Sequence, residues 1–290
     1  MIRRMHPCVS GTTCFRADWL RLGWFSLGLA LGIPGTVADA QPPSFPNYFV
    51  RVWQSDDGLP QNAVSAVVQT RDGYLWVGTY NGLARFDGVR FRVFDHGNTE
   101  QLPNNRVTSL FESDDASLWI SHETGELTRL RDGRFEVVTL PDGWQGRKIV
   151  GIQADGAQDI WLQGDEGTLV RVSDGRVLKP PGGNAPGLFH LVRGGDDGLW
   201  ILSAGKVATL RHGELSPANL EGEAADIYVQ GLARSRRGGM WVASNGRLRR
   251  WSGTAWAEDL GEAPWGMAAL VNLIETKEGF LAAATSEQGL

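Results

Sequence analysis

Short runs of alternating apolar and polar residues recur along most of the chain, and each run is bounded by a turn that contains glycine. In the first clear unit the runs cover residues 64–69, 75–79, 83–86 and 91–94. A period of two between turns of the Asp-Gly or Asn-Gly kind predicts β-strands joined as hairpins. Each unit is therefore expected to contain four short antiparallel strands.

A tryptophan marks the second run of five successive units, and the spacings between these tryptophans are 43, 42, 39 and 41 residues: Trp76, Trp119, Trp161, Trp200 and Trp241. One further step reaches Ala282, in a sixth unit that has lost the tryptophan. Four strands in roughly 40 residues is the size of a β-propeller blade. Leucine-rich repeats are shorter, and helical repeats do not tolerate so many glycine turns. The predicted fold is an all-β propeller of six visible units, the last one incomplete.

The repeated tryptophans have a structural explanation. Blades stack face to face around an axis, so a large flat ring at one register fills the gap between neighbouring sheets. We therefore interpret all five as packing residues between blades and not as ligand contacts.

Composition narrows the class of protein. The 290 residues include 38 glycines and 12 tryptophans, which disfavours a helical bundle because so many glycines would break its helices. A charged fraction of 21% fits neither a membrane bundle nor a disordered acidic chain. The formal net charge of −5 argues against nucleic acid as a partner.

The first forty residues have the layout of a secretory signal peptide. Four arginines precede an apolar stretch at residues 22–33, and Ala38-Asp39-Ala40 forms a small-residue cleavage site. The stretch is too short to span a bilayer. Both cysteines, Cys8 and Cys14, lie in this leader. We expect cleavage after Ala40 and an exported domain over residues 41–290, periplasmic or secreted and without disulfides.

The first unit contains Asp57-Gly58-Leu59-Pro60-Gln61-Asn62, then Asp72-Gly73-Tyr74-Leu75-Trp76-Val77-Gly78-Thr79, then Gly82-Leu83 and Arg85-Phe86-Asp87-Gly88. In these residues it resembles the two-component regulator propeller family. The resemblance covers residues 48–290 and weakens through the third to fifth units. It implies the exported sensor region of a bacterial hybrid histidine kinase or diguanylate cyclase, with seven blades in a propeller.

That resemblance also sets an expectation about the ends of the propeller. No kinase, cyclase or further transmembrane motif is recognisable in the sequence, so the chain resembles only the N-terminal part of such a receptor. Residues 48–54 alternate as a closing outer strand would, yet the sixth unit stops after its second strand. We expect a truncated propeller with a gap or a frayed last blade.

No arrangement of residues predicts catalysis. The histidines lack metal-ligand spacing, no Gly-x-Ser-x-Gly elbow occurs, and no glycine-rich turn opens a helix. We expect no catalytic residues, no metal and no cofactor. Two alternatives stay open, namely a propeller hydrolase or lyase acting on a polysaccharide, and a secreted scaffold that binds another protein.

The remaining feature is a loop face. Connections from one unit to the next gather on one side of a propeller together with the turns between second and third strands, and here they differ in sequence from one another. Exposed aromatic, amide and charged groups on this face suit recognition of sugars or peptides. The candidate ligand-binding residues are Tyr80, Asn81, His122, Glu123, Trp144, Arg147 and Trp265.

Two of these candidates have a second interpretation, because Trp144 and Trp265 could equally pack onto their blades. We expect Trp144→Ala to weaken ligand binding and to leave stability nearly intact. The predicted function is an extracytoplasmic, ligand-binding input module of a signal-transduction receptor. Its predicted partners are a small molecule, oligosaccharide or peptide ligand, an output module outside this sequence, and a second copy in a homodimer.

Overall fold

The structure is a computed structural model that describes residues 51–142, 144, 147–155, 159–180, 190–194, 198–218, 220 and 227–286. The predicted signal peptide at residues 1–40 lies outside these ranges. Within them the chain forms 22 β-strands and one short 3-10 helix, η1 (Ser55–Asp57). The strands form six antiparallel sheets in chain order, five of four strands and one of two.

Each four-stranded sheet is built from consecutive strands, as predicted. The first contains β1 (Val64–Gln69), β2 (Leu75–Thr79), β3 (Gly82–Phe86) and β4 (Phe91–Phe94). The second contains β5 (Val107–Glu112), β6 (Leu118–His122), β7 (Leu127–Arg131) and β8 (Arg134–Val138). The third contains β9 (Ile149–Ala154), β10 (Ile160–Gly164), β11 (Leu169–Arg171) and β12 (Val177–Leu178).

The later sheets repeat this order. The fourth contains β13 (His190–Arg193), β14 (Leu199–Ser203), β15 (Lys206–Arg211) and β16 (Glu214–Pro217). The fifth contains β17 (Val229–Arg234), β18 (Met240–Ser244), β19 (Arg247–Trp251) and β20 (Trp256–Glu262). The sixth contains β21 (Leu270–Glu275) and β22 (Leu281–Thr285).

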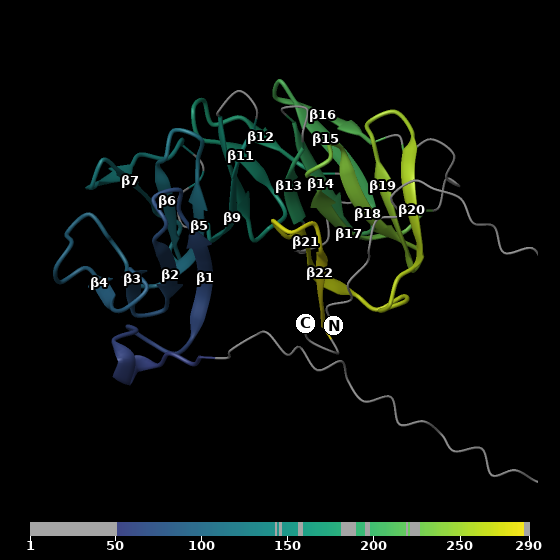
Figure 1. Cartoon of the computed structure of the whole chain (residues 1–290). Helices are drawn as coiled ribbons and strands as arrows, with labels where there is room; N and C mark the ends of the chain where they lie inside the picture. The colour runs from purple at the N-terminus through teal and green to yellow at the C-terminus, as the bar shows by residue number, and fades with distance from the viewer. Residues whose placement is uncertain are drawn as a thin grey trace, which may run out of the picture. The chain divides into compact units, whose positions relative to one another are not determined.

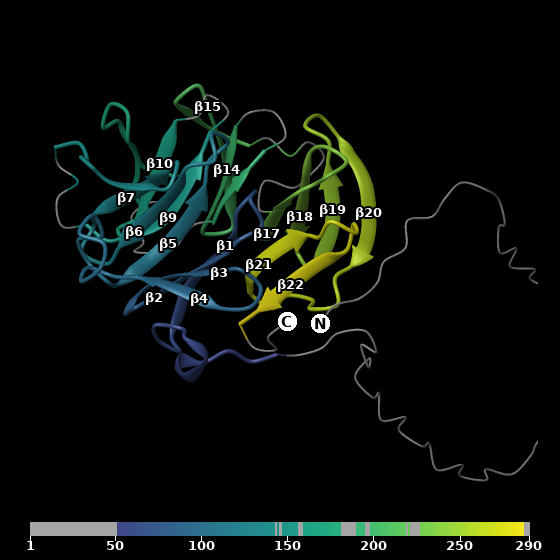
Figure 2. The same cartoon turned by 60° about the vertical axis from the view of Figure 1, so that its left-hand side comes forward.

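The sheets pack one after another as propeller blades. The first strand of each sheet lies beside the first strand of the next, in the series β1, β5, β9, β13, β17 and β21 (Figures 1 and 2). This arrangement confirms the predicted β-propeller fold. The first strands are therefore the inner strands of their blades, and whatever they line together lies near the axis.

The repeated tryptophans are core residues between blades. All five are 0–7% exposed, and each belongs to an apolar cluster that includes residues of the following blade. Trp161, for example, packs with Leu199 and Ile201 of β14. The packing interpretation of the repeat is confirmed.

Hydrogen bonds orient several of these indole rings. The Nε1–H of Trp119 donates to Ser113 Oγ (3.0 Å), and that of Trp161 donates to Asp155 Oδ2 (2.9 Å). In the fifth blade, Trp241 Nε1 reaches Glu275 Oε2 of the next blade at 3.0 Å. Buried N–H donors without an acceptor would be costly, so these partners help fix the ring register.

The two ends of the blade series differ from its middle. The sixth sheet has two strands in the described part of the chain. Of the predicted closing strand, residues 48–50 lie outside the described ranges and residues 51–54 form no strand. Val67 of β1 and Ile274 of β21 are exposed, whereas Leu232, at the position of Val67 in the fifth blade, is buried.

This contrast gives a matched test of the blade interfaces. Leu273 is 4% exposed and packs against the fifth blade, whereas its neighbour Ile274 is 51% exposed. We expect Leu273→Ala to lower the free energy of unfolding by about 2–5 kcal/mol. Ile274→Ala should change it by less than ~0.5 kcal/mol. Urea unfolding of the two variants measures the difference, and equal losses would contradict this assignment of buried and open faces.

Candidate functional site

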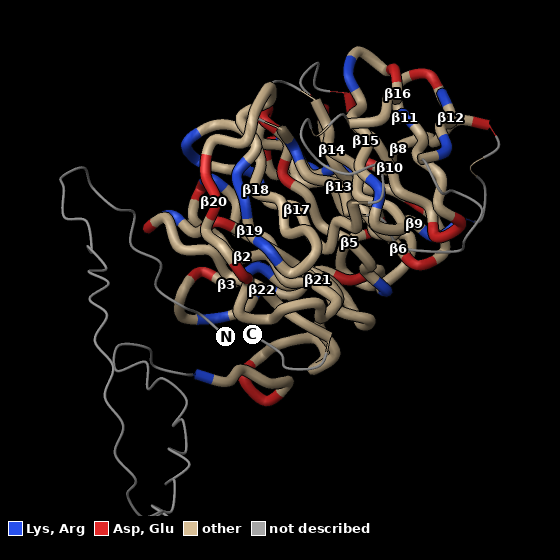
Figure 3. Tube along the Cα trace, turned by 90° about the vertical axis from the view of Figure 1, so that its right-hand side faces the viewer, with Lys and Arg blue, Asp and Glu red and all other residues tan. Residues whose placement is uncertain are grey.

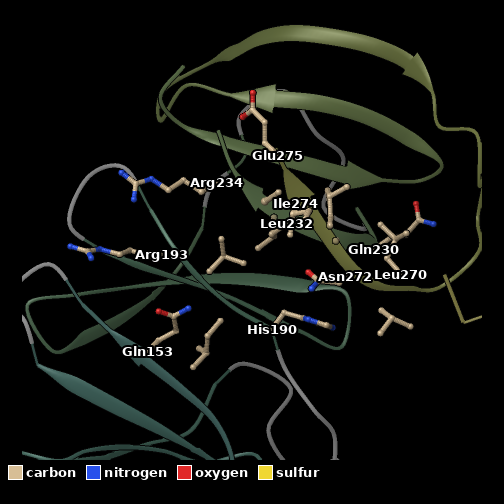
Figure 4. A pocket seen from close by; sticks show the side chains of 16 residues that line it. Gln153, His190, Arg193, Gln230, Leu232, Arg234, Leu270, Asn272, Ile274 and Glu275 are labelled. Atoms are coloured by element: carbon tan, nitrogen blue, oxygen red, sulfur yellow. The ribbon is translucent and has the colours of Figure 1, made fainter. Parts of the chain in front are cut away.

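A cavity of about 420 Å³ lies where four inner strands converge. Its walls come from β13, β17 and β21 together with Gln153 of β9 (Figure 4). Inner strands of four successive blades thus contribute to one space near the axis. We refer to it as the axial cavity.

The lining of the axial cavity follows from how the inner strands end. In three blades the last residues are two apolar side chains followed by a charged one: Leu191-Val192-Arg193, Leu232-Ala233-Arg234 and Leu273-Ile274-Glu275. In the last two blades the first of these, Leu232 and Leu273, is buried, and the charged residue follows where the strand turns. The cavity therefore combines apolar walls with charged groups at the strand ends.

Several polar groups of the lining are already engaged by the protein. Gln230 Nε2 donates to the carbonyl oxygens of Gly266 and Ala268 at 3.0 Å each, and its Oε1 accepts the Gly246 N–H at 2.8 Å. Glu275 accepts the Arg236 N–H at 2.7 Å as well as the Trp241 indole N–H. These two side chains join the fifth and sixth blades and have a structural role.

Two other lining groups, Arg234 and Gln153, have capacity for a ligand, whereas Arg193 is engaged in an ion pair. Arg234 is exposed and has no ion-pair partner among the described residues. Arg193 lies 2.6 Å from Asp114 of the second blade, measured between Nη2 and Oδ2. Gln153 Oε1 is buried without a hydrogen-bond partner in the part of the chain that is described. A buried acceptor of this kind favours a ligand that brings a donor.

His190 and Asn272 add two neutral polar groups (Figure 4). Enclosure by the cavity walls lowers the pKa of the His190 imidazole, because burial disfavours its charged form. This favours the neutral form of the imidazole, which can both donate and accept a hydrogen bond.

On the loop face, the structure connects two of the predicted site residues through Arg106. The Arg106 guanidinium lies 5.4 Å from the centre of the Tyr80 ring, and its Nη1 lies 2.6 Å from Glu123 Oε2. Lys148 Nζ is 3.7 Å from the other oxygen of Glu123. The hydrogen bond from Arg106 lowers the pKa of the Glu123 carboxyl. Tyr80 and Glu123 thus share an exposed polar cluster on the first two blades.

Asn81 and Arg147 make weaker local contacts. Asn81 Nδ2 lies 3.5 Å from the Pro60 carbonyl oxygen, and Arg147 Nη1 lies 3.8 Å from Glu166 Oε2. Neither of them lines the axial cavity, and neither do Tyr80 and Glu123. Their predicted ligand-binding roles stay predictions.

Three predicted contacts turn inward. For His122 this corrects the expectation of exposure, and for Trp144 and Trp265 it agrees with the packing interpretation that the sequence left open. His122 is fully buried with Nε2 3.0 Å from Thr128 Oγ1, and burial lowers the pKa of its imidazole. Trp144 is buried in the core between the second and third blades, and its Nε1–H donates to the Gly125 carbonyl at 3.2 Å. Trp265 is half-buried against the core between the fifth and sixth blades.

Sequence reasoning missed the cavity residues Gln153, His190, Arg193, Arg234 and Asn272. A signal did exist, because each is a polar side chain in the first strand of its repeat unit, where apolar residues predominate. Aligning the inner strands by their last residue would have placed them near one axis.

Two kinds of feature are missing from the described residues. The described residues contain no group of three or more His, Cys, Asp or Glu side chains that could hold a metal ion. No helix in the described ranges is long and apolar enough to cross a membrane.

Comparison with known protein families gives a match within the first blade. A family model described as "two component regulator propeller" matches residues 58–81. These residues are a two-component regulator propeller repeat. They run from the turn before β1 into the turn after β2, and so include the first blade tryptophan.

One curated relative is similar to a short part of this chain. A protein named histidine kinase P4 from Formosa agariphila is 40% identical over 48 residues. The match covers 17% of this chain and 4% of that protein. The chain thus spans a small part of the length of this relative.

Solved structures share the propeller fold. The extracellular domain of a protein described as a hybrid two-component system from Bacteroides thetaiotaomicron matches 82% of this chain and 34% of its own, with 16% identity and a TM-score of 0.56. A second such domain from that organism gives a TM-score of 0.54 at 16% identity, over 79% of this chain and 35% of its own.

A virginiamycin B lyase from Staphylococcus aureus matches 78% of this chain and 85% of its own, with 14% identity and a TM-score of 0.56. At such identities these likenesses show the propeller fold alone.

Proposed function

We propose that this chain is the ligand-binding input module of an extracytoplasmic signal-transduction receptor, and that the axial cavity is its ligand site. The observation that carries the proposal is Gln153 Oε1, a buried acceptor without a partner among the described residues, in a cavity that also presents the exposed Arg234. The propeller repeat at residues 58–81 supports a role in sensing. A cavity of about 420 Å³ is large enough for a small organic ligand.

The same proposal includes the location of the propeller and the module to which it signals. The signal-peptide pattern at residues 1–40 directs the propeller out of the cytoplasm, into the periplasm or the medium. The propeller itself performs no chemistry and passes its ligand state to a histidine kinase or diguanylate cyclase module. The polar cluster around Tyr80 and Glu123 on the loop face is suited to contact with a protein partner or with the rest of a larger ligand.

A cavity-filling variant tests the proposed site. Purified protein is screened against oligosaccharides and peptides for thermal stabilisation, because a ligand at a hundred times its Kd stabilises the folded state by about 2.7 kcal/mol. Asn272→Trp should abolish stabilisation by the best ligand, since Asn272 lines the cavity. Val137→Trp, which introduces the same side chain at an exposed position of β8, is the control. Stabilisation that survives in Asn272→Trp would place the ligand elsewhere.

The competing function is a lyase. The Staphylococcus aureus relative is named as a lyase, and one of its variants, with a histidine replaced by alanine, is described as catalytically inactive. His190 lines the cavity, and a histidine is the side chain that most often transfers protons in enzymes, so a proton-transfer role is chemically available. Mass spectrometry of ligands recovered from the screen decides between the two. Intact ligand supports the input module, whereas products that disappear in His190→Ala support the lyase.

A further inference from the structure

We infer that the axial cavity takes a small hydroxylated carboxylic acid, of the sugar-acid type, whose carboxylate binds Arg234. This inference rests on the proposed function, because it names the class of ligand for the same cavity. Three observations carry it: the charge of the lining, the lack of an ion-pair partner for Arg234 among the described residues, and the buried, unpaired Oε1 of Gln153.

The cavity is more basic than the chain around it. The whole sequence has a formal net charge of −5, yet the lining contains two arginines and one glutamate. That glutamate, Glu275, already accepts two N–H donors of the fifth blade. Two arginines and one glutamate give the lining a formal charge of +1, which favours an anion.

Arg234 differs from the other arginines of its blade. Most of those are neutralised by acidic residues of β20, which Figure 3 shows as blue segments of β19 beside red segments of β20. Arg247 pairs with Asp259 at 2.9 Å, and Glu258 accepts Arg237 at 2.7 Å and Arg250 at 3.3 Å. Arg234 has no such partner within the described ranges. Its guanidinium offers a planar fork of donors that matches a carboxylate.

Arg193 supports this placement. The side chains of Arg193 and Arg234 extend toward the same side of the cavity (Figure 4). The ion pair with Asp114 fixes the Arg193 guanidinium and offsets part of its charge. Arg234 is then the lining arginine without an ion-pair partner in the described ranges, and its single positive charge fits one carboxylate better than a multiply charged phosphate.

The rest of the lining specifies what the carboxylate is attached to. Gln153 Oε1 needs a donor, and a hydroxyl group supplies one. His190 and Asn272 can pair with further hydroxyls, while Leu232 and Ile274 offer apolar contact to a carbon skeleton. An acid with several hydroxyls on a compact skeleton satisfies all of these groups, whereas a fatty acid would leave Gln153 unpaired.

Paired probes test the inference by isothermal titration calorimetry. Glucuronic acid is compared with glucose, and galacturonic acid with galactose, each as monosaccharide and as the homodisaccharide of that unit. Members of a pair differ in one carboxylate, so their affinity ratio isolates the recognition of charge. The monosaccharide and disaccharide arms distinguish a free acid from an acidic unit within a larger chain. We expect at least one acid to bind about tenfold more tightly than its neutral partner.

Two arginine variants locate the effect. Arg234→Gln should remove the preference for the acid, and Arg236→Gln, two residues along and outside the lining, should retain it. Raising the salt concentration should weaken the binding of the acid and leave the binding of the neutral sugar unchanged. Gln153→Leu should lower the affinity for the acid about tenfold without changing how that affinity depends on salt. Near-native circular dichroism of each variant shows that the fold is kept.

The outcomes separate the two proposals. Equal affinity for acid and neutral sugar, an acid preference that survives in Arg234→Gln, or no binding of any probe overturns the inference about the ligand class. A neutral ligand whose binding is abolished by Asn272→Trp overturns this inference and leaves the proposed function standing. Acid binding that persists in Asn272→Trp overturns the assignment of the cavity, and with it both.

Discussion

Replacing Trp161 by alanine is expected to lower the free energy of unfolding by about 3–5 kcal/mol. The indole is fully buried between the third and fourth blades, so its removal leaves a cavity that the sheets cannot close without shifting. The variant also removes the N–H donor to the buried Asp155 carboxylate. Urea unfolding followed by circular dichroism measures the loss.

The control for Trp161→Ala is Val177→Ala, in the outer strand of the same blade. Val177 is 54% exposed, so this change should be nearly neutral. An unchanged unfolding midpoint in Trp161→Ala would show that the indole is not packed between blades, and the repeat register would then be wrong.

Trp144→Ala is expected to cost a similar amount, about 3–5 kcal/mol. The sequence indicated a loop residue whose loss would leave stability intact, and the structure reverses that expectation. The side chain is buried in one cluster with Trp119 and Leu162, and its N–H is bonded to the Gly125 carbonyl. Thermal and urea unfolding measure the loss.

Tyr80→Ala is the matched control for Trp144→Ala. Tyr80 is an exposed aromatic residue on the same face, in the turn between β2 and β3. Its removal should change the free energy of unfolding by less than ~0.5 kcal/mol. Equal stability of the two variants would restore the original interpretation of Trp144 as a loop residue.

The strands were predictable because the repeat fixes their phase. In the first blade the predicted ranges and the observed strands agree to within one residue, with only β3 beginning earlier, at Gly82. A turn with glycine and a tryptophan at fixed spacing specify the same hairpin five times, so local error averages out. The same phase placed every repeat tryptophan on the correct strand and face.

The direction of side chains in the connections was less predictable. Whether Trp144 points out or in depends on the turn at Gly125, which has φ +95. That turn brings Gly125 against the backbone of Arg147, so the connection lies directly over the second blade. The repeat pattern does not predict the contact between Gly125 and Arg147, because the two residues lie in two different kinds of turn.

The cavity could not be predicted from loops at all, because strand ends form it. Arg193, Arg234 and Asn272 are far apart in the sequence, and only the curvature of the blade series brings their strands together. A single arginine at a strand end predicts nothing by itself. The geometry of four blades gives the three residues a common environment.

The ion pair between Asp114 and Arg193 has a consequence for cooperativity. Asp114 follows β5 in the second blade and Arg193 ends β13 in the fourth, so the 2.6 Å contact passes over the third blade. In a repeat architecture each unit contacts its neighbours, and stability is then a sum of units and nearest-neighbour interfaces. The ion pair between the second and fourth blades adds a contribution to stability that such a sum does not contain. The second, third and fourth blades are thereby coupled, and they should open together in native-state hydrogen exchange.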